Sequence, residues 1–74
     1  MINIDTNKID ANYLKYLVFK KGLQMKDLAI ILDVSCPSLY LRLRGQVDWK
    51  LSEMKKIKES LELSDEDFKK VFGF

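Results

Sequence analysis

The sequence predicts one compact all-α domain built from five short helices. Apolar residues recur at spacings of three and four in several short segments, which is the pattern of helices with one buried face. Clusters of β-branched residues are scarce, and one proline and three glycines interrupt the chain. The length of 74 residues is close to the smallest at which a single hydrophobic core suffices.

We divide the chain into an N-terminal arm, residues 1–9, and a folded domain, residues 10–74. The arm is polar with alternating isoleucines, a pattern that also fits an edge strand or a segment that docks on a partner chain. We favour a frayed terminus. Asp10 is expected to cap a first helix over residues 11–21, which Gly22 ends.

The first helix has an apolar face, which we expect in the core: Leu14, Leu17 and Val18. Aromatic residues extend this apolar surface around the helix: Tyr13, Tyr16 and Phe19. Stacking on single-stranded nucleic acid is one use for such rings. We favour packing in the core or against another subunit.

Two short helices are predicted next, over residues 25–32 and 36–44. The residues that join them are Asp33, Val34 and Ser35. A turn of this length makes two helices cross steeply, as in a helix-turn-helix. Ser35 is a good N-cap, and Pro37 is tolerated just inside the second helix because the first amides have no intrahelical partner.

Each helix of this pair is expected to bury one face. The buried residues would be Leu28, Ala29 and Leu32 on the first helix, and Leu39 and Leu43 on the second. The outer face of the second helix then carries Pro37, Ser38, Tyr40, Leu41 and Arg44. Arg42 is expected on a flank of that face.

The second helix of the pair is expected to end at Gly45, and a loop over residues 46–50 follows. The loop contains the single tryptophan, Trp49, which we expect to anchor it to the core in preference to a subunit contact. A fourth helix is predicted over residues 51–61. Its apolar stripe would be Leu51, Met54, Ile57 and Leu61.

The last predicted helix covers residues 65–72, and Ser64 opens a sequence that resembles a capping box. Apolar residues lie on one side of this helix: Phe68, Val71 and Phe72. Phe74 then ends the sequence. Two alternatives stay open for this apolar end, which either folds back onto the core or is shared with a second subunit.

Composition narrows the possible functions. The sequence has no histidine and one cysteine, so we expect neither an internal disulfide nor a zinc site, and a reducing cytoplasm is the natural setting. There is no glycine-rich phosphate loop and no nucleophile with a plausible activating base, so we expect neither an enzyme nor a cofactor. The apolar runs are too short for a membrane span.

The charge distribution mildly favours a polyanionic partner for the first two thirds of the chain. The formal net charge is +2, and residues 1–50 hold eight basic and five acidic side chains. Residues 51–74 hold five basic and six acidic side chains. The positive excess therefore lies in the part that contains the helix pair.

Several motifs occur in a characteristic order: Lys-Gly-Leu at 21–23, Asp-Leu-Ala at 27–29, Val-Ser at 34–35, Leu-Tyr-Leu-Arg-Leu-Arg-Gly at 39–45, Leu-Ser-Glu-Met-Lys-Lys-Ile at 51–57 and Leu-Glu-Leu-Ser-Asp-Glu-Asp-Phe at 61–68. In this order and spacing, residues 10–74 resemble the lambda-repressor and Cro type of helix-turn-helix domain, also called the Cro/CI or XRE family. The C-terminal sequence, Phe-Lys-Lys-Val-Phe-Gly-Phe at 68–74, is similar to that of short regulators of Gram-positive phages and mobile elements.

This resemblance implies a five-helix domain that binds double-stranded DNA sequence-specifically and regulates transcription, commonly as a repressor and as a homodimer on a palindromic operator. Such a protein would act in the bacterial cytoplasm, at the nucleoid. The residues facing bases would be Ser35, Cys36, Pro37, Ser38, Tyr40 and Leu41. Contacts to the DNA backbone would come from Gln24, Met25, Lys26, Arg42, Arg44, Gln46 and Lys50.

The outer face of the second helix is unusually apolar for a surface that reads bases. An alternative function is therefore a helix-turn-helix modulator that pairs with another phage repressor through Ile30, Pro37, Tyr40 and Leu41. A third interpretation, in which a homodimer buries these residues, also stays open.

Overall fold

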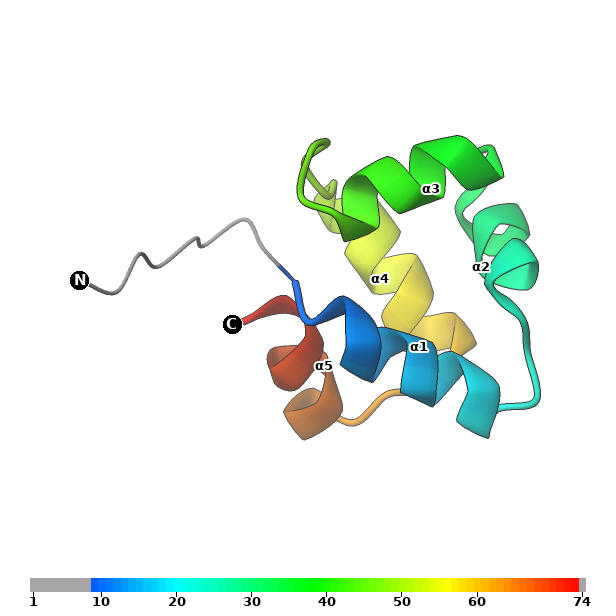
Figure 1. Cartoon of the computed structure of the whole chain (residues 1–74). Coiled ribbons are helices and arrows are strands. Elements are labelled where there is room, and N and C mark those ends of the chain that lie inside the picture. Colours follow the sequence, from blue (N-terminus) through cyan, green and yellow to red (C-terminus); the bar gives the residue numbers. More distant parts are fainter. Residues whose placement is uncertain (1–8, 74) are drawn as a thin grey trace.

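The computed structural model describes residues 9–73, and within this range the chain forms five helices and no strand. The helices are α1 (Ala11–Lys20), α2 (Met25–Leu32), α3 (Cys36–Leu43), α4 (Leu51–Ser60) and α5 (Asp65–Phe72). The all-α prediction is confirmed (Figure 1). The predicted bounds of α2 and α5 are the observed ones, whereas α1, α3 and α4 end one residue earlier than expected. Most of the predicted arm, and Phe74, lie outside the described residues.

Side-chain caps explain where three of the helices begin. The carboxylate of Asp10 accepts a hydrogen bond from the Tyr13 amide at 3.0 Å, at the start of α1. The hydroxyl of Ser35 caps α3 at 3.2 Å, and that of Ser64 caps α5 at 3.1 Å. Each cap satisfies an amide that has no partner within its helix. These three N-caps were predicted and are confirmed.

The core draws on all five helices. Its buried apolar residues are Leu14, Leu17, Val18, Leu28, Ala29, Leu32, Leu39, Leu43, Ile57, Leu61, Leu63, Val71 and Phe72. The predicted buried faces of α1, α2 and α3 are therefore confirmed. Tyr16 and Phe19, in contrast, stay largely exposed in this chain and do not pack in its core.

The predicted apolar stripe of α4 is wrong at its first position. Leu51 is 61% exposed, whereas Glu53 in the same helical turn is buried. In this first turn of α4, Glu53 faces α3 and pairs with Arg42, and Leu51 points to solvent. Met54 is half-buried and packs against the core, and Ile57 is fully buried.

In Figure 1, α3 lies near the start of α4. Helix α5 begins near the end of α4, where Asp65 pairs with Lys58, and ends with Phe72 against Trp49, just before the start of α4. Helix α1 packs against α5 and α2. Helix α2 packs against both α3 and α4. The amide of Asp10 donates to the carbonyl of Val71 at 2.9 Å, which ties the start of the domain to α5. None of the described helices is long and apolar enough to cross a membrane.

Trp49 anchors the segment between α3 and α4 to the core, as predicted. Its indole ring meets the Phe72 ring edge-on, with centroids 5.4 Å apart. Its Nε1–H donates to the carbonyl oxygen of Arg42 at 3.1 Å. The C-terminal turn of α3, the following loop and α5 are thereby held together.

Candidate nucleic-acid interface

The turn between α2 and α3 has a defined backbone conformation. Asp33 takes the left-handed conformation, with φ 59° and ψ 45°, and its amide donates to the carbonyl of Ile30 at 3.0 Å. The amide of Val34 donates to the carbonyl of Ala29 at 3.0 Å. Aspartate adopts this conformation more readily than most residues other than glycine. Val34 packs half-buried against the core, which ties the turn to the rest of the domain.

Helix α3 buries one face and exposes the other. Leu39 and Leu43 lie in the core. The predicted base-facing residues that are exposed are Ser35, Cys36, Pro37, Tyr40 and Leu41, and Arg44 is exposed beside them. Tyr40 and Leu41 are each 37% exposed. These side chains form one continuous outer surface on α3, which we call the α3 face.

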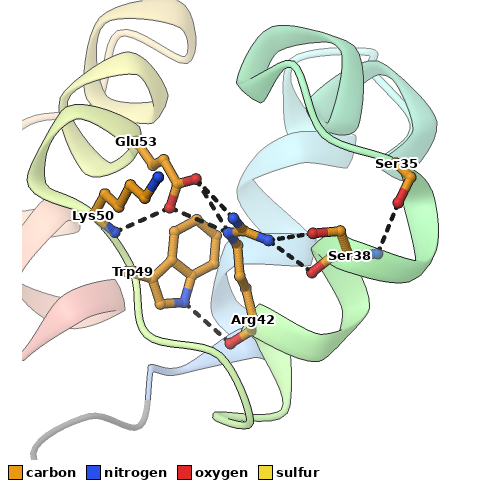
Figure 2. A network of polar contacts seen from close by, with 6 residues as sticks. All are labelled: Ser35, Ser38, Arg42, Trp49, Lys50 and Glu53. Carbon is orange, nitrogen blue, oxygen red and sulfur yellow. Dashed lines mark hydrogen bonds and ion pairs between the residues drawn. The ribbon is translucent and has the colours of Figure 1, made fainter.

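Ser38 differs from the other predicted base-facing residues because it is half-buried and its polar atoms have partners within the protein. Its carbonyl oxygen accepts a hydrogen bond from Nη1 of Arg42 at 3.1 Å, and its hydroxyl oxygen accepts another from the same atom. Its amide donates to the Ser35 hydroxyl. Figure 2 shows Ser38 turned toward the guanidinium of Arg42.

Arg42, which was expected on a flank of the α3 face and among the residues that contact the DNA backbone, is buried. Its guanidinium forms an ion pair with Glu53 of α4, with Nη2 and Oε2 3.1 Å apart. Nε donates to both carboxylate oxygens at 3.2 Å. The side chains of Arg42 and Glu53 are only 10% and 8% exposed. Arg42 therefore faces α4 and is removed from the set of residues that can contact a DNA backbone.

Glu53 also holds the start of α4. Its Oε1 accepts a hydrogen bond from the Lys50 amide at 3.0 Å, in addition to the bonds from Arg42 (Figure 2). Burial raises the pKa of Glu53, but the Lys50 amide and the hydrogen bonds and charge of Arg42 outweigh burial and leave this pKa below its ordinary value. The carboxylate is thus ionised at neutral pH and stays paired with Arg42.

The N-terminus of α2 carries a negative charge that the sequence analysis missed. Oδ2 of Asp27 accepts a hydrogen bond from the Gln24 amide at 2.8 Å. Among the predicted contact residues here, Gln24 and Lys26 are exposed, whereas Met25 is half-buried against the core. The spacing of three residues between Gln24 and Asp27 is the signal that indicates such a reciprocal cap.

Three predicted backbone-contact residues combine a positive charge with exposure: Lys26, Arg44 and Lys50. Gln24 and Gln46 add exposed amide groups that can donate hydrogen bonds. Asp33 and Asp48 are also exposed in this region, so its positive potential is modest. Glu53 neutralises Arg42. Of the predicted backbone-contact residues, Lys26, Arg44 and Lys50 are therefore the ones that can bring a positive charge to DNA phosphates.

No family model matches the chain, and neither a curated protein nor a solved structure matches it. The resemblance to Cro/CI domains therefore stays a prediction from the motifs. The functional assignment has to depend on the geometry described above: an exposed helix face that follows a tight turn and has cations at its borders.

Proposed function

We propose that this protein is a sequence-specific, DNA-binding regulator of transcription of the Cro/CI type. In this proposal α2 and α3 form a helix-turn-helix, α3 enters the major groove of a double-stranded operator, and α2 crosses the DNA backbone. The observation that carries the proposal is the α3 face, which is exposed along its length while Leu39 and Leu43 hold the opposite side in the core.

The chemistry of the α3 face suggests how it would read bases. The Tyr40 hydroxyl can donate or accept a hydrogen bond at a base edge. Pro37 and Leu41 are apolar and suit the methyl group of thymine. Ser38 contributes less, because Arg42 already engages its hydroxyl oxygen. We therefore expect an operator rich in A·T pairs where α3 meets it.

Phosphate contacts would come from Lys26, Arg44 and Lys50, with Gln24 and Gln46 as neutral donors. One short helix buries too little surface for tight binding, so we propose a homodimer on a palindromic operator. Its half-sites would lie one helical turn apart, roughly 34 Å. Repression of a neighbouring promoter in the bacterial cytoplasm is the function that follows from the family resemblance.

Selection from a pool of random duplexes, followed by a salt titration, tests the proposal. The full-length chain should enrich one palindromic duplex and prefer it over a scrambled duplex of the same composition. Three phosphate contacts per chain predict a log–log salt slope of about −2.7 per chain, or roughly −5 for a dimer. Failure to enrich any sequence, or a slope close to zero, would contradict DNA binding through this face.

A second candidate function is the pairing of this chain with another repressor. The observation that favours it is the apolar character of the outer surface, where Ile30 is 75% exposed and Leu41 lies on the α3 face. Ile30→Asp separates the two functions, because Ile30 is not among the predicted DNA-contact residues. Under the modulator hypothesis this variant loses binding to the repressor encoded beside its gene, measured by titration calorimetry. Under the DNA-binding hypothesis it binds the selected duplex like the unmodified chain.

A further inference from the structure

We propose that Arg42 and Glu53 are positioning residues that govern how well the protein discriminates its operator from other DNA, without contacting the DNA themselves. This inference rests on the DNA-binding function proposed above. It assigns a role in recognition to a buried ion pair that lies behind the α3 face. The pair joins the last turn of α3 to the first turn of α4.

The geometry of Arg42 fixes the position of α3 from two sides. Its guanidinium reaches Glu53 on α4 through three contacts of 3.1–3.2 Å. The same group also binds the carbonyl and hydroxyl oxygens of Ser38, one turn earlier in α3. A planar guanidinium that makes several bonds at once restrains rotation as well as distance, which a single lysine ammonium would not.

The main chain of Arg42 is restrained in addition to its side chain. Its carbonyl oxygen accepts hydrogen bonds from Nε1 of Trp49 at 3.1 Å and from the Gly45 amide at 3.1 Å. Trp49 in turn packs on Phe72. Figure 2 shows the bonds of Arg42 to Glu53 and to Trp49. Together with the packing of Trp49 on Phe72, they fasten the end of α3 to α4 and to α5.

Two features show why apolar packing alone leaves the rotation of α3 less defined. Helix α4 contacts α2 more extensively than it contacts α3, and the Arg42–Glu53 pair is a direct side-chain link between α3 and α4. The apolar residues of α3 in the core, Leu39 and Leu43, lie on one stripe of a helix of eight residues. Buried polar pairs can specify one arrangement among several apolar packings of similar energy.

A rotation of α3 would move the α3 face, Arg44 included, relative to the base edges, whereas Lys26 and Lys50 lie outside α3 and would stay in place. Base contacts depend on directed geometry, whereas nonspecific affinity depends mainly on charge. Loss of the ion pair should therefore weaken operator binding and spare nonspecific binding. Loss of about one good base contact corresponds to roughly a tenfold decrease in affinity for each chain, and therefore to roughly a hundredfold decrease for the proposed dimer on its operator.

The test compares the double variant Arg42→Met/Glu53→Met with the control Arg44→Gln, both in the full-length chain. The double variant replaces both charges by flexible apolar side chains of similar length, so no charge is left buried alone. Arg44 is the matched control because it carries the same charge as Arg42 and lies two residues after it, but its side chain is exposed. The probes are a duplex selected by the unmodified chain and its scrambled counterpart, each titrated at several salt concentrations.

We expect the double variant to bind the selected palindromic duplex roughly a hundredfold more weakly, about tenfold for each chain, with unchanged affinity for the scrambled duplex and an unchanged salt slope. Arg44→Gln should weaken both duplexes and reduce the magnitude of the slope by about 0.9 per chain. Discrimination by the double variant equal to that of the unmodified chain overturns the positioning role, as does a slope change like that of Arg44→Gln. If the unmodified chain does not prefer the selected duplex, DNA reading itself is wrong.

A nuclear magnetic resonance readout tests the same inference without affinities. The Nε–H signal of Arg42 should be visible in the free protein, because the bond to Glu53 slows its exchange with water. It should keep its chemical shift when the selected duplex is added, while signals of Arg44 and Tyr40 move. A large shift of the Arg42 signal, as direct contact with phosphate would cause, contradicts the inference.

Discussion

Removal of one partner of the Arg42–Glu53 pair should destabilise the domain far more than removal of both. Glu53→Gln keeps an oxygen that can accept from the Lys50 amide but leaves the buried guanidinium without its counter-charge. Arg42→Met leaves the carboxylate buried among fewer donors. Breaking a buried pair in this way costs about 3–5 kcal/mol, whereas apolar replacement of both partners is often close to neutral.

A loss of about 3–5 kcal/mol is large for so small a domain, because its total free energy of unfolding is expected to be only about 5 kcal/mol. A loss of about 3 kcal/mol would lower Tm by roughly 12–24 °C. Urea unfolding followed by circular dichroism measures the free energies, and Trp49 fluorescence reports on the same region independently, since its indole bonds to Arg42. Single variants within about 0.5 kcal/mol of the unmodified chain would refute the reasoning, because surface-exposed pairs behave in that way. So would a double variant as unstable as the sum of the two singles.

The remaining predictions concern the pH dependence of stability and one strained backbone position. The pKa of Glu53 is lower in the folded chain than in the unfolded chain. Its contribution to the free energy of unfolding is therefore fully present above the unfolded pKa of about 4.3 and is lost as the pH falls through the folded pKa. Glu53→Gln should reduce the loss of unfolding free energy at acid pH, as measured by urea unfolding at several pH values. The hydrogen bond from Tyr13 to Asp67, 2.6 Å long, together with burial and nearby negative charge, raises the pKa of Tyr13 to about 12. The contribution of this bond to the free energy of unfolding is therefore fully present below about pH 10 and is lost as the pH rises through about 12. Asp67→Asn should return one phenol toward its ordinary pKa in an absorbance titration, and an unchanged curve would contradict the bond. Glu62 has a left-handed backbone with φ 52°, so Glu62→Gly should raise the unfolding free energy by about 0.5–1 kcal/mol while Glu62→Ala does not, as measured by urea unfolding.

The sequence by itself determined the features that depend on neighbouring residues along the chain. Helical periodicity predicted the five helices to within one residue, since burial of one face and 3.6 residues per turn leave few alternatives. Short polar side chains predicted the caps at Asp10, Ser35 and Ser64, because each cap bridges only three residues. The anchoring of Trp49 was predicted from the size of its indole ring, although its contact with Phe72 joins residues far apart in the sequence.

Only the tertiary structure decided what happens at the edges of each helical face. Arg42 and Ser38 lie at the border between the buried and exposed sides of α3, and periodicity cannot say which way such residues turn. The outcome depended on α4, which places Glu53 at that border, while Leu51 in the same turn of α4 stayed in solvent. Long charged side chains choose partners by the relative placement of two helices, and that placement is a property of the whole packed core and not of either segment.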